Sequence, residues 1–211
     1  MAVSTARGRH APPPEVRLPL QRERLLRAAA REFAQRGYAG ASSESISRRA
    51  GMSKATFYEH FANKEECMLE LFDMGAQVVQ VAMAQAARNA PVGDARERLR
   101  AGTRAFLGAL ADHPEFAQTL LVEIIGAGPR AAQRRDQILQ AFADVLDAEN
   151  AAAHRRGLMG RFRSPLDSFA VVGAITELVS RQVRLGVPGH VMELAPVIDR
   201  LIFGLLDDGP S

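Results

Sequence analysis

Apolar residues recur every three or four positions along nearly the whole chain, from about residue 21 to residue 206. This spacing puts them on one face of an α-helix, and no segment shows the strict alternation that predicts a half-buried strand. Proline and glycine interrupt the pattern, for example at Pro91, Gly128 and Pro188, and divide it into segments of helical length. The sequence therefore predicts an all-α protein of about nine helices with no sheet.

The ends of several predicted helices carry caps. Ser53, Asp94 and Ser164 are N-cap residue types that precede apolar-periodic segments, and Glu97 completes a capping box with Asp94. Gly37 stands where a C-terminal glycine would end the first helix. These signals place the helices at about residues 21–36, 43–50, 54–61, 64–89, 95–111, 112 onward, 129–156, 165–185 and 190–206.

The composition is that of a globular chain from a reducing compartment. Its 211 residues are 47% apolar and 24% charged, which is ordinary for a folded protein. The single cysteine, Cys67, excludes a disulfide framework and a multi-cysteine zinc site. No apolar run approaches the roughly 18 residues of a membrane span, and residues 1–20 lack the apolar centre of a secretory signal. We therefore expect a cytoplasmic protein with no membrane partner.

Charge is distributed unevenly along the chain. Residues 1–64 hold twelve basic and five acidic side chains, whereas the remaining residues hold fifteen basic and nineteen acidic ones. A basic head on a mildly acidic body suggests a module that meets a polyanion, although a solvated basic face without a partner gives the same count. We expect a disordered basic arm at 1–20, a DNA-binding head at 21–65 and a helical regulatory body at 66–207.

The segment 43–61, SESISRRAGMSKATFYEHF, has the pattern of a helix-turn-helix. Two short helices are joined by the glycine-containing segment 51–53, as in that motif. Phe57 and Phe61 share one face of the second helix, so we expect them to pack inward. Their expected neighbours are Phe33, Ile46 and Ala50. An ordinary αα-hairpin is the plainer interpretation, but the second helix also exposes a lysine and polar aromatic side chains.

Around this motif, residues 24–69 resemble the tetracycline-repressor (TetR) family of bacterial transcription regulators. The matching positions are Leu26, Ala28, Ala29, Phe33, Gly37, Tyr38, Ile46, Ala50, Gly51, Ser53, Thr56, Phe57, Tyr58, His60, Phe61, Lys64 and Glu65. In three places the chain departs from the family: Ala41 replaces a common threonine, Ser43 an aliphatic residue and Ala55 a glycine. The resemblance implies a sequence-specific regulator, most often a repressor, that a small molecule releases from a palindromic operator.

The helix at 54–61 is expected to enter the major groove, where an α-helix fits and every base pair is distinguishable. Lys54 suits guanine and Thr56 suits a base or a phosphate, while the resemblance implies that Tyr58 and His60 donate to phosphates. Glu59 is the odd member, because a carboxylate is unfavourable near phosphates; its candidate roles are to read cytosine or to select against wrong sites. The candidate contacts to double-stranded DNA are Ser42, Ser43, Ser53, Lys54, Ala55, Thr56, Tyr58, Glu59, His60 and Lys64.

The last two predicted helices carry apolar stripes at helical spacing. The resemblance implies that they form a four-helix interface in a homodimer, which suits a palindromic operator. The candidate interface residues are Phe169, Val172, Ile175, Val179, Val183, Leu194, Ile198, Leu201 and Leu205. The same stripes also fit packing within one subunit, because periodicity reports burial without saying what covers the helix.

The resemblance also implies a pocket for an unknown small-molecule ligand among the middle helices. The candidate lining residues are Met68, Phe72, Phe106, Leu110, Phe116, Leu120, Glu123, Phe142 and Thr176. Core packing is the competing interpretation for the apolar members. Glu123 and Thr176 stand among apolar residues, where each would orient a ligand, face solvent or satisfy a backbone group. No residue identifies the ligand, and no cofactor is expected.

Other functions have less support in the sequence. The chain contains no HExxH motif, phosphate-binding glycine loop, Gly-x-Ser-x-Gly or paired-cysteine motif, so neither catalysis nor a metal site is expected. The basic head also fits a nonspecific or architectural DNA-binding protein, and the body also fits a helical ligand carrier. Binding confined to one palindrome in excess competitor DNA would distinguish a regulator from both.

Overall fold

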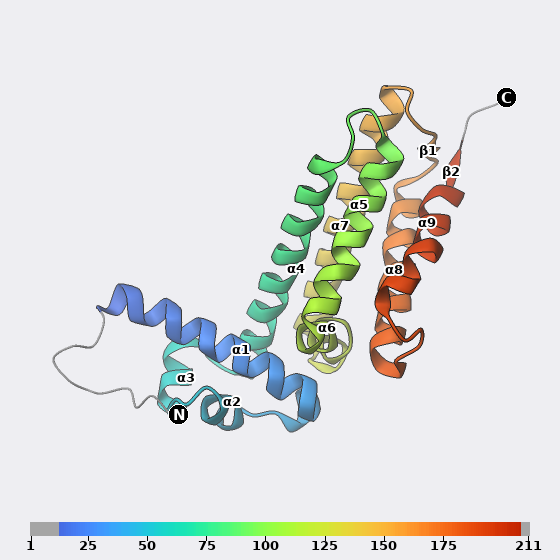
Figure 1. The fold of residues 1–211 in the computed structure, drawn as a ribbon. Helices are drawn as coiled ribbons and strands as arrows, with labels where there is room; N and C mark the ends of the chain where they lie inside the picture. Colours follow the sequence, from blue (N-terminus) through green and yellow to red (C-terminus); the bar gives the residue numbers. More distant parts are fainter. Residues whose placement is uncertain (1–12, 208–211) are drawn as a thin grey trace.

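The computed structural model describes residues 13–207, and these residues are helical almost throughout (Figure 1). The α-helices are α1 (Pro14–Gly40), α2 (Ser43–Arg49), α3 (Lys54–His60), α4 (Lys64–Asn89), α5 (Ala95–Asp112), α6 (Pro114–Leu121), α7 (Pro129–Arg155), α8 (Pro165–Leu185) and α9 (Ala195–Gly204). Two 3₁₀ helices and two strands complete the elements, namely η1 (Glu123–Gly126), η2 (Val191–Leu194), β1 (Arg161–Phe162) and β2 (Leu206–Asp207). The predicted all-α class is confirmed.

Helix α1 begins earlier than predicted, at Pro14 instead of residue 21. Proline at the first helical position has a suitable φ and lacks only an amide that would have no intrahelical partner. The carbonyl of Pro13 accepts from the amides of Val16 and Arg17, both at 3.0 Å, so the first turn is closed. The predicted disordered arm is therefore wrong for residues 14–20, and residues 1–12 lie outside the described part. Gly37, with φ +71°, breaks the helix where its end was predicted.

The last predicted helix is divided in two, and a small sheet follows it. Pro196 stands in the first turn of α9, which therefore begins anew after the separate 3₁₀ turn of η2. After α9, β2 pairs antiparallel with β1, joining Phe162 to Leu206 and Arg161 to Asp207. The prediction of no sheet was wrong at this point, because two-residue strands are too short to show an alternating pattern.

The helices form a head and a body that share α4 (Figure 1). Helices α1 to α3 make the head, and α6 lies between the head and the long helices of the body. One hydrophobic core joins the head to the start of α4 and to η1, through residues such as Phe33, Met68 and Ile124. A second core joins α5, α8 and α9, through residues such as Leu107, Val179 and Ile198. The first core thus extends across the predicted domain boundary at 65–66.

Helix α4 corrects the expectation that no segment is apolar enough to span a membrane. Among residues 13–207, it is the helix that is long and apolar enough to cross a membrane by length and composition alone. Its mean hydropathy is 1.2 over 18 residues. In the fold, α4 packs along α5 and also contacts α1, α6 and α7. Its apolar residues therefore serve the protein's own cores, including buried Leu71, Phe72 and Val79.

Candidate nucleic-acid interface and ligand cavity

The helix-turn-helix forms at the predicted residues, and serines cap both helices. Ser42 and Ser45 make a capping box at the start of α2, in which each hydroxyl accepts from the other residue's amide, at 3.1 and 3.0 Å. The Ser53 hydroxyl accepts from the amide of Thr56 at 3.1 Å and caps α3. Between the helices, Gly51 has φ +67°, in the left-handed region that favours glycine. Local sequence therefore fixes both the helices and their turn.

The inner face of α3 rests on the core of the head, as predicted. Phe57 is completely buried and Phe61 nearly so, and their ring centroids lie 5.4 Å apart. Phe33 and Ile46 are also completely buried in the same cluster. Because this base is closely packed, α3 is held in a fixed orientation relative to α1 and α2.

The outer face of α3 is open to solvent. Lys54, Tyr58 and other candidate contacts on it are exposed, and Tyr58 retains 49% of its accessible surface. The Tyr58 hydroxyl lies 3.1 Å from the Ser43 hydroxyl, so α2 and α3 contribute to one polar surface. The Thr56 hydroxyl lies 3.0 Å from that of Ser53. The structure therefore brings most of the candidate DNA contacts together on one side of the head.

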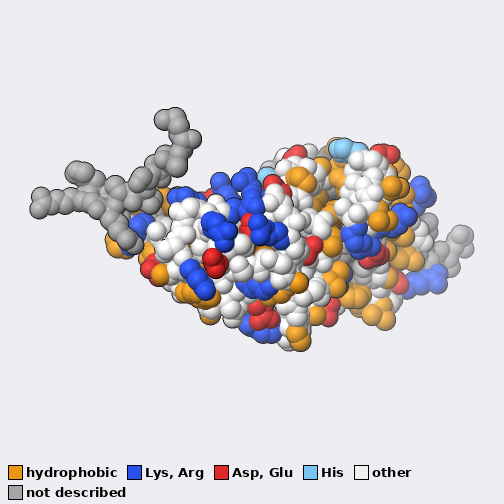
Figure 2. Space-filling view, turned by 90° about the horizontal axis from the view of Figure 1, so that it is seen from below, with side chains coloured by type: hydrophobic (Ala, Val, Ile, Leu, Met, Phe, Trp, Pro, Cys, Tyr) orange, Lys and Arg blue, Asp and Glu red, His pale blue; other side chains and the backbone are white. Residues whose placement is uncertain are grey.

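Lysine and arginine side chains gather on the face of the head seen in Figure 2. Part of the basic excess of the head is nevertheless bonded inside the protein. Arg22 pairs with Glu70 and donates to the carbonyl of His60 at 2.9 Å. Arg24 donates to the carbonyl of Ala50 at 2.8 Å, at the end of α2. The charge that faces DNA is therefore smaller than the count from the sequence suggests.

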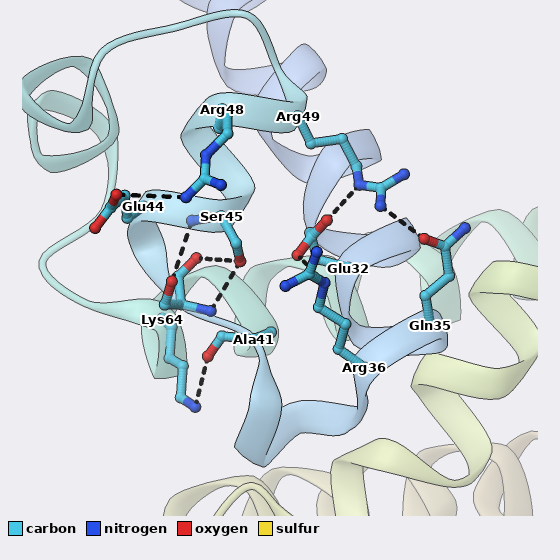
Figure 3. Close-up of polar contacts among 10 residues, drawn as sticks. Glu32, Gln35, Arg36, Ala41, Glu44, Ser45, Arg48, Arg49 and Lys64 are labelled. Carbon is cyan, nitrogen blue, oxygen red and sulfur yellow. Dashed lines mark hydrogen bonds and ion pairs between the residues drawn. The ribbon is translucent and has the colours of Figure 1, made fainter.

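A buried carboxylate ties α1 to α2 (Figure 3). Glu32 is 2% exposed, and its oxygens lie 2.5 Å from Nε of Arg49 and 3.2 Å from Nε of Arg36. Burial opposes ionisation of Glu32, but hydrogen bonds from Arg49 and Ser45 and the charges of both arginines outweigh it and lower the pKa of the carboxyl. Arg49 also donates to the Gln35 side chain at 2.6 Å. Sequence reasoning missed this role, because Arg49 and Glu32 stand 17 positions apart in the chain.

Lys64 is engaged inside the head, a role that the sequence did not reveal. Its ammonium donates to the carbonyls of Tyr38 and Ala41, at 2.7 and 3.1 Å, and lies 4.2 Å from the centroid of the Tyr38 ring. Burial lowers the pKa of Lys64. An ammonium has three donors, so at most one remains for a phosphate. The main effect of Lys64 in the structure is to hold the end of α1 against α4.

His60 lies at the end of α3 and is only partly exposed. Its Nε2 is 3.4 Å from the side-chain oxygen of Gln21 on α1. Burial and the charge of Arg22 lower the pKa of His60, against the opposing effects of Glu59 and Glu70. This environment favours the neutral imidazole, which can gain a proton when a phosphate approaches.

The head is bonded to the body through α6 and η1. The Glu123 carboxylate accepts from the amide of Tyr38 at 2.8 Å, directly after the break at Gly37. The buried Thr119 hydroxyl lies 3.1 Å from the carbonyl of Ala30 in α1. Glu123 thus satisfies a backbone amide of the head, one of the three roles that the sequence left open, and it is not among the residues that line the cavity described below.

A cavity of about 120 Å³ lies among α4, α5, α6, α7 and α8. It is lined by Phe72, Gly75, Ala76, Val79, Met83, Thr103, Phe106, Leu110, Leu120, Leu121, Arg135, Ile138, Leu139, Phe142, Val172, Ile175 and Thr176. Six of the candidate lining residues are among them, namely Phe72, Phe106, Leu110, Leu120, Phe142 and Thr176.

The cavity also corrects the predicted lining. Met68 is completely buried in the core of the head, and Phe116 packs against that same core, so neither lines the cavity. Sequence reasoning missed Arg135 as a lining residue, because it stands in the polar run 133–137, QRRDQ, which is typical of a solvated helix face. Gly75 was missed as well, although a glycine in a helix often signals close packing.

The predicted dimer stripe is largely turned toward its own subunit. Val179 and Ile198 are completely buried and Leu194 is 6% exposed, all in the second core. Val172 and Ile175 line the cavity. These five residues face their own subunit in the structure, because an apolar stripe shows that a helix face is covered without showing by what; the dimer interface itself stays a prediction. The remaining candidates are half-buried or exposed, namely Phe169, Val183, Leu201 and Leu205.

Residues 13–207 contain no group of three or more histidine, cysteine, aspartate or glutamate side chains that would hold a metal ion. Cys67 is fully buried, and burial raises the pKa of its thiol. A buried thiol held in its neutral form is a poor nucleophile.

Comparison with known proteins agrees with this arrangement. Residues 25–71 match the family described as bacterial regulatory proteins, tetR family. The uncharacterized HTH-type transcriptional regulator YdgC of Bacillus subtilis (strain 168) is 28% identical over 196 residues, which cover 89% of this chain and 94% of that protein.

Solved structures share the fold over most of the chain. The transcriptional regulator FadR from Bacillus subtilis in complex with stearoyl-CoA has a TM-score of 0.76 at 21% identity, covering 88% of this chain and 99% of that one. AibR in complex with isovaleryl coenzyme A and operator DNA has a TM-score of 0.66 at 20% identity, covering 88% and 100%. The head matches the family, the relative extends the match along the chain, and the helical body has the same fold. The head of the chain, residues 25–71, is that of the tetR family of bacterial regulatory proteins.

Proposed function

We propose that the chain is a homodimeric repressor that binds a near-palindromic operator and leaves it when a small molecule fills the cavity. The observation that carries this proposal is the exposed polar face of α3, fixed on a packed aromatic base and continued by α2 through the contact of Tyr58 with Ser43. A DNA-binding regulator of a bacterium acts in the cytoplasm, which is the location we propose.

Each exposed group on this face suits one kind of DNA contact. Lys54, at the first position of α3, donates to guanine, and Thr56 donates to a neighbouring base or phosphate. Ser43, Tyr58 and His60 donate to phosphates and set the register of the head. Ser42, Ser53, Ala55, Glu59 and Lys64 complete the proposed set, with Lys64 limited to its remaining donor.

The dimer face that we propose is the outward side of α8 and α9. A side chain added at Gly173 in α8 or at Gly204 in α9 would meet no atom within 4 Å, so both faces are open. Leu201 is half-buried and Leu205 is 43% exposed beside them. Small residues allow close helix packing, and a second copy that covers these apolar groups places two heads on two half-sites.

Helix α6 supplies a route from the cavity to the head. Leu120 lines the cavity, while its neighbour Thr119 bonds to Ala30 of α1 and Glu123 bonds to Tyr38 just beyond the Gly37 break. A ligand that displaces Leu120 therefore shifts groups that hold the head. Release of DNA needs a coupling free energy of only about 1–3 kcal/mol. The ligands named for FadR and AibR support an acyl thioester or a related acyl compound as the ligand.

Selection of bound fragments from random duplex DNA, followed by affinity measurements, tests the DNA-binding part. We expect one near-palindromic site, a uniform loss of roughly fivefold to tenfold across sites for Tyr58→Phe, and a changed base preference at one position for Thr56→Ala. Equal affinity for all duplexes would instead favour the alternative, a nonspecific or architectural DNA-binding protein. A uniform loss for Thr56→Ala would remove that side chain from base recognition.

A further inference from the structure

The cavity is small compared with common ligand pockets, which measure roughly 300–1,000 Å³. Its volume is about 120 Å³. An apolar cavity of about 150 Å³ holds one benzene molecule, so roughly five or six carbons fit here. A saturated chain of eighteen carbons would need roughly three times that space. The cavity therefore favours a compact apolar group over a long chain.

The cavity wall is apolar with one charged exception. Besides Arg135, its polar side chains are Thr103 and Thr176, of which Thr176 donates to the Val172 carbonyl at 2.8 Å. Arg135 comes from α7, and its side chain is 26% exposed, so the guanidinium lies where the cavity meets solvent. A neutral apolar molecule would leave this charge without a counterpart.

Arg135 is only weakly paired within the protein. Its nearest described carboxylate is that of Asp136 at 3.9 Å, and that side chain is 73% exposed. The two preceding arginines of α7 are firmly held, since Arg130 and Arg134 each donate to a carboxylate at 2.6 Å. A guanidinium presents a planar fork of N–H donors that matches a carboxylate or a phosphate. Arg135 therefore keeps its donors available for an anion.

The position of Arg135 also sets the direction of a bound molecule. Its neighbour Arg134 pairs with Asp73, whereas Gly102, next to Thr103, lies against Met83. Asp73 and Met83 are separated by about 15 Å along α4. Arg135 thus marks the end of the cavity closer to the head, and Thr103 marks the far end.

We propose that the cavity binds a compact apolar acyl group of roughly five or six carbons, branched or cyclic, that carries an anion, and that Arg135 binds this anion. The inference deepens the proposed function and rests on it for the role of the ligand in DNA release. The anion is either the carboxylate of a free acid or a phosphate of a carrier thioester. Both present the same oxygens to the guanidinium.

Calorimetric titration of the full chain tests the proposal with isovaleryl-CoA, stearoyl-CoA and free isovalerate. The two thioesters differ only in the acyl group, and isovalerate distinguishes the two sources of the anion. We expect isovaleryl-CoA or isovalerate to bind, and stearoyl-CoA to bind at least about tenfold more weakly than the better of the two, because its chain exceeds the cavity. Arg135→Gln should weaken the better ligand about tenfold or more through loss of a charged hydrogen bond.

Arg155→Gln, on the exposed end of the same helix, is the matched control and should leave affinity unchanged. Gly75→Ala provides a second variant, because the added methyl group meets Leu120 at the cavity wall and should reduce binding of the same ligand. Equal or tighter binding of stearoyl-CoA, unchanged affinity of Arg135→Gln, or no binding of either isovaleryl compound would overturn the proposal.

Operator selection keeps the two proposals separable. A chain that selects a palindrome but binds neither isovaleryl compound refutes this inference and leaves the proposed DNA-binding function in place. A chain that binds isovaleryl-CoA through Arg135 but selects no DNA refutes the proposed regulator and leaves the inference standing.

Discussion

Glu32 and Arg49 allow an asymmetric test of how the head is held together. The carboxylate side chain is 3% exposed, whereas the Arg49 side chain is 28% exposed and also reaches Gln35. Removing the arginine leaves a buried negative charge, but removing the carboxylate leaves a cation that water can reach. The variants Arg49→Met and Glu32→Gln should therefore destabilise the protein unequally.

The structure sets the expected magnitudes. Breaking a buried ion pair by removing one partner costs about 3–5 kcal/mol. Arg36 remains 3.2 Å from the carboxylate in Arg49→Met, which places that loss near the lower end, at about 3 kcal/mol. For Glu32→Gln we expect about 1 kcal/mol, the contribution of an ordinary hydrogen bond. The first variant should thus shift the unfolding equilibrium roughly thirtyfold more than the second.

Urea unfolding followed by far-UV circular dichroism measures both losses, at one fixed protein concentration because association changes apparent stability. Arg27→Met is the control, since its pair with Glu23 is exposed on both sides and should contribute no more than about 1 kcal/mol. A loss for Glu32→Gln that equals or exceeds that of Arg49→Met would refute the reasoning.

The pH dependence gives a second readout of the same carboxyl group. Its pKa is lowered in the folded state, so its stabilising effect is present above the unfolded value, near 4.5, and is lost as pH falls through the folded pKa. The free energy of unfolding of the wild-type protein should exceed that of Glu32→Gln at neutral pH, and this difference should shrink only below about pH 4.5. The free energies of unfolding of the two proteins should be compared from neutral pH down to about pH 3. A difference that stays constant over this whole range would contradict a lowered pKa.

Three further predictions concern the break in α1, the phosphate contact and the dimer. Gly37→Ala should destabilise the protein by about 1–2 kcal/mol in urea unfolding, because Gly37 has a positive φ. The control Gly40→Ala should not, because φ at Gly40 is not positive. Equal effects of the two substitutions would contradict this reasoning. If His60 donates to phosphate, its lowered pKa rises on binding, so operator affinity should increase as pH falls below about 7 and should be flat for His60→Gln. The same pH dependence in both proteins would remove His60 from the contacts. Gly173→Arg should yield folded monomers in light scattering, since the position is open in one subunit; an intact dimer would place the interface elsewhere.

Cap residues and glycines in the sequence predicted where several helices begin and where the chain turns. The caps at Ser53, Asp94 and Ser164 accept the amides expected of them, and Gly37 and Gly51 adopt positive φ where the chain must turn. These features depend on residues within one or two helical turns, so the sequence contains what is needed to predict them. The early start of α1 was missed because proline was taken as a sign of disorder when it also begins helices.

The partner that each of several charged side chains contacts is distant from it in the sequence. Arg49 meets Glu32, Lys64 meets the end of α1, and Glu123 meets the amide of Tyr38 across 85 positions. A count of charges cannot distinguish an arginine that faces DNA from one that holds two helices together, because both give the same composition.

The sequence by itself determined the helical class, the helix-turn-helix and the residues that α3 exposes, because these follow from periodicity, caps and a turn within a short segment. Only the tertiary structure decided which apolar stripe of α8 and α9 faces its own core, which side chains line the cavity and which cation stays weakly paired at its wall. Helical spacing indicates that a face is buried, but packing between elements distant in the sequence determines which element covers that face.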